Sequence, residues 1–379
     1  MLSDFNPVLV KETFAHVMTD AQKAMEYFFA RLFVCNPEIR AMFPLAMSEL
    51  RGRVFGALAR LVWSLDSPAA AAAYLGQLGR DHRRFGVRDK HYQAFFDALL
   101  TTVQHFSGPA WTPEVSQAWT AALAGALAVM RTAAAADAGR QPPWWTGEIV
   151  RHERRGERLA VLTIRPGQPL GYRPGQYLSV QVPRWPRVWR SFSVANAPRA
   201  NGLIDLHVRA VPGGMVSTAL VQHAAVGDAL LLGPARGEMT LPPEAAGRDL
   251  LCLAGGTGLA PVKAIVQSVI TAPAAGRPAR ITLLVGARRS EDLYDLPDLE
   301  ALRARYPALT LIPVVSHDPG FAGQRGLLPQ IARQQAAPAD CEVFVSGPDA
   351  MVAAAERLLG DRIPAGRLHH DPPARPVSL

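Results

Sequence analysis

The sequence has few cysteines and few lysines. Its three cysteines, Cys35, Cys252 and Cys341, lie far apart along the 379 residues, so they cannot form a disulfide framework or a four-thiolate iron–sulfur site. Only four of its 40 basic residues are lysine, and the arginines are scattered without a run of five or more. This distribution argues against a nucleic-acid-binding stripe, although the formal net charge is +8.

The chain also lacks an apolar run as long as a bilayer is thick. The closest window, Thr120–Met130, is too short to cross a membrane, and the first 18 residues contain Asp4, Lys11 and Glu12 in place of an apolar signal core. Hydrophobic residues nevertheless make up 49% of the chain, which is enough for a core in each of two or three domains. We therefore expect a cytoplasmic protein without a membrane span.

Residues 1–138 carry apolar side chains at the 3.6-residue period of amphipathic helices, for example Val10, Phe14 and Val17. Helix breakers such as Asn36-Pro37 separate the periodic stretches. We expect an all-α domain of five to seven helices. The Ala- and Gly-rich residues 133–139 and the following Gln-Pro-Pro form a candidate linker.

After the linker the apolar period falls to two. Leu178, Val180 and Val182 alternate with polar residues, and Arg155-Gly156 separates two such runs as a hairpin turn does. Many short strands within about a hundred residues favour a small antiparallel β-barrel over residues 144–245.

Residues 246–379 show a different alternation. Apolar runs begin near residues 250, 281, 309 and 342, and a helical stretch follows each of them. This order predicts an α/β domain with a parallel sheet covered by helices.

Three short segments fit phosphate or ring binding. The turn Gly255-Gly-Thr-Gly258 lies between a buried strand and a helix, where unpaired backbone amides can hold a pyrophosphate. Gly213-Gly-Met-Val-Ser217 and Arg190-Ser-Phe-Ser193 offer hydroxyls, a guanidinium and an aromatic ring. Taken singly, each segment also fits an ordinary turn or a half-exposed strand.

In their order along the chain, and together with Arg173-Pro-Gly-Gln-Tyr177 and Ser346-Gly-Pro348, these segments resemble the ferredoxin reductase family. Enzymes of that family pair an FAD-binding barrel with a nicotinamide-binding α/β domain. The cofactor-binding residues that the resemblance implies are Gln176, Tyr177, Arg190, Phe192, Ser193, Gly214, Met215, Val216, Ser217, Gly256, Thr257, Gly258, Arg288, Ser346, Gly347 and Pro348.

The same resemblance implies particular roles. Arg190 would hold the FAD pyrophosphate, Phe192 would stack on the isoalloxazine, and Ser193 would contact the flavin ring. Ser346 stands near the nicotinamide, where the family often has cysteine. Arg288 follows the second strand of the α/β domain, where NADP-dependent relatives hold a ribose phosphate, but NADH enzymes also carry Gly-Ala-Arg there. We expect NAD(P)H as electron donor, with NADH favoured.

The helical domain contains a candidate iron ligand. His82 lies on an apolar helix face, where a satisfied core histidine and a haem ligand are both possible. However, the segments 27–43 and 81–85, with Tyr92, resemble the globin domain of flavohaemoglobins, so the whole chain is similar to that family. The resemblance implies haem b, with His82 as the ligand of the haem iron, Phe43 against the porphyrin and Tyr92 near His82.

The sequence departs from that family around the gas-binding side. The distal tyrosine of the family aligns with Phe29, the distal glutamine falls near Leu50, and the glutamate that polarises the proximal histidine aligns with Ala134. Residues 368–373 replace the carboxy-terminal aromatic that usually covers the flavin. We count His82, Tyr92, Phe29 and Leu50 as the candidate catalytic residues.

These inferences predict an oxidoreductase that passes electrons from NAD(P)H through FAD to haem, with nitric oxide dioxygenation to nitrate as the leading reaction. Three alternatives stay open: an NAD(P)H-dependent haem or flavin reductase with another acceptor, a haem-based redox or gas sensor, and a flavin reductase beside a globin fold that holds no haem. The expected ligands are oxygen, nitric oxide and NAD(P)H. The sequence names no protein partner.

Overall fold

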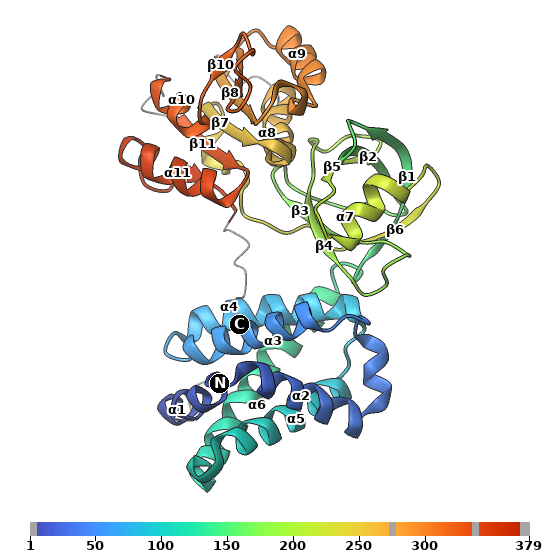
Figure 1. The fold of residues 1–379 in the computed structure, drawn as a ribbon, viewed down its shortest axis with the longest axis vertical. Helices are drawn as coiled ribbons and strands as arrows, with labels where there is room; N and C mark the ends of the chain where they lie inside the picture. The colour runs from blue at the N-terminus through green and yellow to red at the C-terminus, as the bar shows by residue number, and fades with distance from the viewer. Residues whose placement is uncertain (1–5, 273–277, 336–340, 372–379) are drawn as a thin grey trace. The chain divides into compact units, whose positions relative to one another are not determined.

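The computed structural model describes residues 6–272, 278–335 and 341–371. The chain forms two compact units, one running to Pro143 and the other starting at Trp144 (Figure 1). The first unit is helical. Its α-helices within the described residues are α1 (Pro7–Met18), α2 (Ala21–Cys35), α3 (Ser48–Trp63), α4 (Pro68–His82), α5 (Asp89–Ser107) and α6 (Pro113–Ala138).

Local sequence fixes where several of these helices begin. The side chain of Asn6 accepts a hydrogen bond from Val8 N, and Thr112 does the same for Val115 N, so both act as N-caps. Inside the unit, Trp119 of α6 is 2% exposed and donates from its indole nitrogen to the hydroxyl of Thr13 in α1, over 2.9 Å. The largest buried ring therefore has its one polar atom satisfied.

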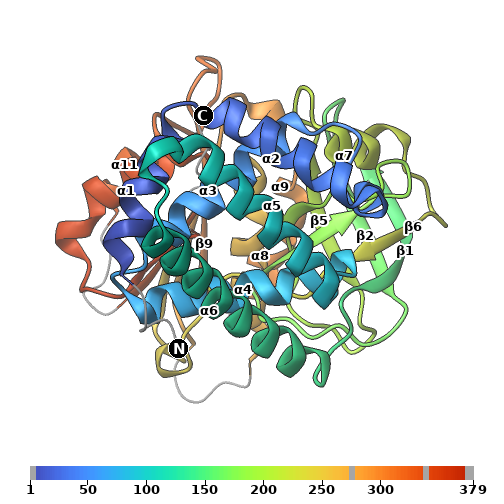
Figure 2. The same ribbon diagram turned by 90° about the horizontal axis from the view of Figure 1, so that it is seen from below.

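Helices α4 and α6 meet at a glycine. A Cβ atom placed on Gly79 would lie 2.2 Å from the carbonyl oxygen of Met130, whereas one on Gly76 would meet Ala133 at an ordinary 3.6 Å. Figure 2 shows α6 in green with α4 beside it. Because α4 ends at His82, this close crossing places the candidate iron ligand relative to α6.

Helix α6 is longer than the apolar run from which we predicted it. Its 26 residues include an 18-residue window of mean hydropathy 1.3, which makes it the one helix among the described residues that could cross a membrane by length and composition. The difference arises because the helix continues on both sides of Thr120–Met130. Its inward face packs into the core of the unit through residues including Ala118, Trp119, Ala122, Leu123 and Met130.

The second unit contains two six-stranded sheets. The antiparallel sheet is built from β1 (Trp145–Arg154), β2 (Leu159–Pro166), β3 (Tyr177–Gln181), β4 (Arg190–Ser193), β5 (Ile204–Arg209) and β6 (Ala229–Leu232), in the order β4-β3-β6-β1-β2-β5. A bridge between Val194 and Leu206 brings the two edge strands β4 and β5 together, so the sheet nearly closes into a barrel. A short helix, α7 (Met215–Thr218), follows β5.

The other sheet is parallel, in the order β10-β9-β8-β7-β11-β12. Its strands are β7 (Asp249–Gly255), β8 (Ile281–Ala287), β9 (Leu309–Val315), β10 (Gln324–Arg325), β11 (Cys341–Ser346) and β12 (Leu368–His369), and its helices are α8 (Leu259–Thr271), α9 (Leu296–Arg305), α10 (Leu328–Gln334) and α11 (Asp349–Leu359).

Alternate residues of β7 pack into two different cores. Leu250 and Cys252 lie in a core that includes residues of α8 and α9, whereas Leu251 and Leu253 lie in one that includes residues of α10 and α11. The sheet is therefore covered on both faces, and β7 is apolar from Leu250 to Gly255. The predicted fold class is confirmed: an all-α domain, an antiparallel barrel and a parallel α/β domain.

The glycine crossing yields a stability prediction. We expect Gly79→Ala to destabilise the helical unit by roughly 1–3 kcal/mol, because α4 must move away from Met130. Gly76→Ala on the same helix is the matched control and should stabilise the unit by roughly 0.5–1 kcal/mol, since alanine fits there and is the better helix former. Urea unfolding of the full chain, followed by helical circular dichroism, measures both. Equal effects of the two substitutions would contradict this interpretation of the crossing.

Candidate functional site

His82 is the last residue of α4, and its ring faces Tyr92 of α5 with 5.9 Å between ring centroids. Nδ1 of His82 is buried and has no hydrogen-bond partner among the described residues. Burial lowers the pKa of His82 to about 4, so the imidazole is neutral near pH 7. A neutral imidazole is the form that binds a metal ion.

The carboxylate of Asp137 in α6 lies near the end of α4, but it pairs with Arg83, the residue after His82. Asp137 is buried and pairs with the guanidinium of Arg83, which also donates to the carbonyl oxygen of Gln141 over 2.7 Å. The amide of Gln141 donates to the other oxygen of Asp137 over 2.9 Å. The buried acid of α6 thus neutralises Arg83, and Ala134, at the position that the family fills with glutamate, offers His82 no anionic partner.

Phe29 and Phe43 come together although they lie in different elements. Phe29 in α2 is 2% exposed, and its ring meets that of Phe43 edge-on at 5.7 Å. Phe33 contacts Phe43 at 5.3 Å, and Phe28 contacts Phe29 at 4.9 Å. These four rings form an aromatic cluster that contains no hydrogen-bond donor. Leu50 is half-buried in the first turn of α3.

Tyr27 belongs to a different face of α2. Its ring stacks on His105 of α5 with 4.5 Å between centroids and 3° between planes, and it meets Phe106 edge-on. Two residues along a helix correspond to a rotation of about 200°, which explains why Tyr27 and Phe29 diverge. The hydroxyl of Tyr27 therefore does not compensate for its absence at Phe29.

In the barrel, the predicted flavin-binding residues of β3 and β4 are neighbours. Tyr177 pairs with Ser193, and Leu178 pairs with Phe192. Arg190 and Phe192 share one face of β4 and Ser193 lies on the other, because side chains alternate along a strand. Arg190 is half-buried, and its guanidinium donates to the carbonyl oxygen of Trp189 over 3.0 Å.

In two of the predicted flavin-binding segments, side chains form hydrogen bonds with nearby backbone groups. The amide of Gln176 accepts from Arg173 N over 2.8 Å and donates to Gly237 O over 3.1 Å, so it ties two loops together. The hydroxyl of Ser217 accepts from Val211 N over 3.3 Å. Gly214, Met215 and Val216 lie between these groups in the turn that starts α7, where a Cβ on Gly214 would approach Ser217 Oγ to 2.6 Å.

The barrel and the parallel sheet together line a cavity of about 1130 Å³. It contains nine of the predicted residues: Phe192, Ser193, Gly256, Thr257, Gly258, Arg288, Ser346, Gly347 and Pro348. The carboxyl ends of β7, β8 and β11 open into it, which is where open parallel sheets bind nucleotides. A Cβ on Gly258 would lie 2.3 Å from Ser346 O, so the two glycine turns touch through backbone alone.

Sequence reasoning missed several residues of this cavity, among them His207, Arg209, Asp292, His317 and Arg357. His207 and Arg209 occupy the polar positions of β5, which the alternation rule assigns to the water-facing side. Asp205 and His207 do not follow that rule, since they are 7% and 4% exposed. The polar face of β5 is buried because the parallel sheet lies against it, and no pattern within β5 indicates this.

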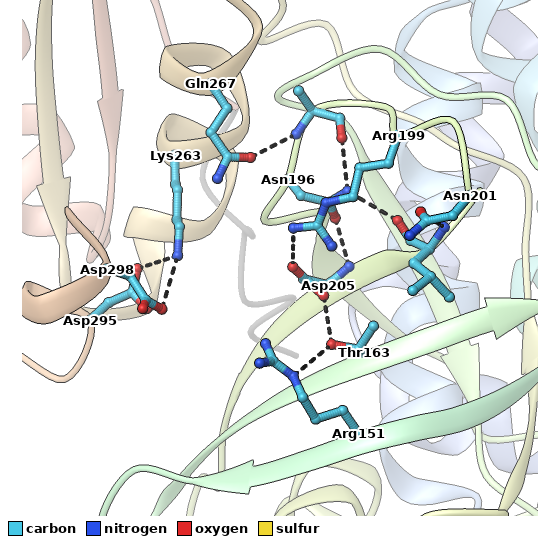
Figure 3. Close-up of polar contacts among 12 residues, drawn as sticks. Arg151, Thr163, Asn196, Arg199, Asn201, Asp205, Lys263, Gln267, Asp295 and Asp298 are labelled. Atoms are coloured by element: carbon cyan, nitrogen blue, oxygen red, sulfur yellow. Dashed lines mark hydrogen bonds and ion pairs between the residues drawn. The ribbon is translucent and has the colours of Figure 1, made fainter. Parts of the chain in front are cut away.

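Figure 3 shows the polar contacts along this side of the barrel. Asp205 accepts hydrogen bonds from Thr163 over 2.7 Å and from Arg199 over 2.6 Å. In the α/β domain, Lys263 of α8 pairs with Asp295 over 2.6 Å. Gln267 of α8 accepts from the backbone nitrogen of Ala197 over 3.1 Å, which links α8 to a loop of the barrel.

The carboxy-terminal segment is polar where the family has an aromatic residue. His369 of β12 stacks on Phe344 at 4.8 Å and contacts Glu342 through Nε2 at 2.7 Å. Asp371 lies beside Gly237, next to the ring of Tyr177. Residues 372 and 373 of this segment lie outside the described residues.

Three protein-family models match successive parts of the chain. A globin model matches residues 26–130, an oxidoreductase FAD-binding domain matches residues 150–240, and an oxidoreductase NAD-binding domain matches residues 252–357.

Known proteins match either the reductase part or most of the chain. The electron transfer component of xylene/toluene monooxygenase from Pseudomonas putida is 33% identical over 215 residues, 56% of this chain and 60% of its own length. A flavohemoprotein of Bordetella pertussis is 29% identical over 327 residues, which cover 81% of this chain and 80% of the relative.

A solved structure extends the similarity to the whole fold. The flavohemoglobin of Malassezia yamatoensis, determined with bound FAD and heme, aligns over 98% of this chain and 99% of its own with a TM-score of 0.77. The sequence identity of 16% makes this a likeness of fold. The order of the three matched regions, the flavohemoprotein relatives and this shared fold together make the chain a divergent member of the flavohaemoglobin family.

Proposed function

We propose that this chain is an NAD(P)H-dependent oxidoreductase that carries haem b and FAD and converts nitric oxide and oxygen to nitrate. The observation that carries the proposal is the pairing of two sites in one chain. One is a neutral histidine with a buried, unpartnered nitrogen in a globin-type unit. The other is the cavity that joins barrel and parallel sheet. We assign residues 1–138 to the haem domain, 144–245 to the FAD domain and 246–379 to the nicotinamide domain.

The residues of the helical unit fit a haem. His82 can offer one ring nitrogen to iron, and the aromatic cluster around Phe43 can pack against a flat macrocycle. Within the described ranges no three His, Cys, Asp or Glu side chains gather into a metal site. An iron bound by His82 therefore needs further ligands from a prosthetic group, and Tyr92 would steady the histidine ring from the side.

The residues of the cavity fit a flavin beside a dinucleotide. Phe192 offers a flat apolar ring, Ser193 a hydroxyl, and the turn at Gly256–Gly258 offers backbone amides at the start of α8. Arg288 lines the same cavity, and Asp318 holds the neighbouring Ser290 by a 2.6 Å hydrogen bond. NADH as the preferred donor remains a prediction from the sequence.

Bound FAD would supply hydride acceptance from NAD(P)H, and bound haem would supply a redox-active iron that gases can reach. The chain itself contributes the neutral ligand nitrogen of His82, an apolar gas-binding side around Phe29, and the glycine turns that let a pyrophosphate approach the backbone. A cytoplasmic location remains a prediction from the sequence.

The apolar gas-binding side also favours a second candidate function. Phe29 and its aromatic neighbours offer no hydrogen bond to a polar ligand, and Leu50 adds none. Oxygen activation for nitric oxide dioxygenation profits from such a donor. A slow dioxygenase would be indistinguishable in fold from an NAD(P)H-dependent haem or flavin reductase that serves another acceptor.

The direct test is nitric oxide consumption by the purified holoprotein with oxygen and NADH. We expect a Soret band with a flavin shoulder, NADH-dependent loss of nitric oxide and nitrate as product. Both cofactors with NADH oxidation but no nitric oxide turnover would favour the other-acceptor function. A spectrum with flavin alone would contradict the haem assignment.

The assignment of His82 yields a second prediction. We expect His82→Ala to lose haem while it retains FAD and NADH oxidation with an artificial acceptor, because the ligand and the cavity lie in different units. His105→Ala is the matched control, since His105 is exposed and stacks on Tyr27. Haem content by the pyridine haemochrome assay decides the point. Full haem retention in His82→Ala would show that another residue binds the iron.

The aromatic cluster yields a third prediction. We expect Phe29→Tyr to slow the release of oxygen from the reduced protein by roughly tenfold, which corresponds to about 1.4 kcal/mol. Tyr27→Phe should change nothing, because that ring points toward His105. Stopped-flow displacement of oxygen by carbon monoxide measures all three proteins. Slow release from the unmodified protein, unchanged in Phe29→Tyr, would reveal a donor elsewhere.

A further inference from the structure

His207 is a buried polar residue on the wall of the cavity. It lies on β5 of the barrel and is 4% exposed. The bridge between Val194 and Leu206 sets β5 alongside the end of β4, so His207 follows Leu206 in register with Ser193. On the same face of β5, Arg209 approaches the turn at Gly256 to within 3.9 Å of a Cβ placed there. His207 is thus next to the predicted flavin contact and near the predicted pyrophosphate turn.

The ring of His207 is held by the other sheet. Its Nδ1 lies 2.8 Å from the hydroxyl oxygen of Tyr294, and the two rings meet nearly perpendicular with centroids 5.4 Å apart. Tyr294 lies in the loop before α9, and its neighbour Asp295, the N-cap of that helix, is anchored by Lys263 of α8. One hydrogen bond therefore orients a barrel side chain from the parallel-sheet side.

The second nitrogen of His207 is available. Among the described residues the ring hydrogen-bonds through Nδ1, and Nε2 is not one of the fully buried atoms that lack a partner, so it can be reached from the cavity that His207 lines. Burial holds the pKa of His207 well below its usual value and raises the pKa of Tyr294 well above its own, so both groups are neutral near pH 7. When the phenol of Tyr294 donates to Nδ1, the hydrogen of the imidazole is on Nε2, which then acts as a donor at the cavity wall.

We propose that His207 is a positioning residue for the nicotinamide ring, and that its Nε2–H group donates to the carboxamide oxygen of the dinucleotide while Tyr294 holds the imidazole. The inference rests on the proposed function. The carboxamide is the one hydrogen-bonding group of an otherwise flat ring, and a donor at the cavity wall without a protein partner among the described residues can pair with its oxygen. Hydride transfer needs the reacting atoms about 3–3.5 Å apart, so one fixed contact influences its rate strongly.

Two substitutions of His207 separate its two nitrogens. Asparagine places an amide near the position of Nδ1 and can keep the contact with Tyr294, whereas glutamine reaches the position of Nε2 and can keep the donor to the cavity. We expect His207→Asn to lower the limiting rate of flavin reduction by NADH roughly tenfold, and His207→Gln to stay within about threefold of the unmodified protein. Anaerobic stopped-flow of the holoprotein gives the limiting rate and the apparent Kd separately.

The opposite order would overturn the proposal. If asparagine preserves the rate and glutamine does not, the His207–Tyr294 bond only joins the two sheets. Equal rates in both variants and the unmodified protein would also overturn it. Thermal unfolding and FAD content, which a purely structural role would change, are expected to be the same in all three proteins.

A third variant covers the case in which His207 substitutions disturb folding. Tyr294→Phe removes only the hydroxyl, and we expect it to lower the limiting rate at least about threefold, because the imidazole is no longer fixed. An unchanged rate would contradict the proposal. If NADH and NADPH both fail to reduce the flavin of the unmodified protein, the proposed function fails. Reduction of that flavin with no effect in the variants overturns only the role of His207.

Discussion

Close backbone approach at glycine is the constraint on which both units depend. In the helical unit, α4 can cross α6 only because Gly79 has no side chain against the carbonyl of Met130. In the second unit, the turn after β7 touches the turn after β11 because Gly258 has none against Ser346. Both contacts are made by backbone atoms, which cannot move aside as a flexible side chain can. Each one therefore sets the position of a site: His82 in the first unit and the cavity in the second.

Buried polar groups differ in whether the protein itself supplies their hydrogen-bond partners. Some find their partners within the protein: Arg83 pairs with Asp137, and Asp205 accepts hydrogen bonds from Thr163 and Arg199. Nδ1 of His82 is buried without a partner among the described residues, and Nε2 of His207 makes no hydrogen bond to them at the cavity wall. Because an unpaired polar atom is unfavourable when it is buried, a ligand that paired with either atom would gain a hydrogen bond. Both lie where the family resemblance expects a cofactor or the dinucleotide.

This chain diverges from its family around the haem and also in the reductase part, where Ser346 replaces the frequent cysteine and residues 368–373 replace the aromatic that usually covers the flavin. The reductase part keeps its glycine turns, its Arg-x-Phe-Ser strand and a cavity shared by both sheets. The globin part keeps the histidine and Phe43, but an aromatic cluster takes the place of the distal donor, and Asp137 is committed to Arg83. Electron delivery is therefore the better-preserved half of the proposed activity, and gas chemistry is the half in which this chain differs.

The sequence by itself determined the order and class of the three folds and nine of the residues that line the cavity. Helices show an apolar period of 3.6 residues and strands a period of two, and glycine turns connect strand to helix. These features follow from local geometry, so residues such as Gly258 and Ser346 could be predicted. Only the tertiary structure decided which polar side chains are buried. By alternation alone His207 would be a water-facing residue of β5, but it is buried and contacts Tyr294, which lies in a loop about ninety residues later. Contacts between distant segments leave no period in the sequence, because each partner sits in an ordinary local pattern.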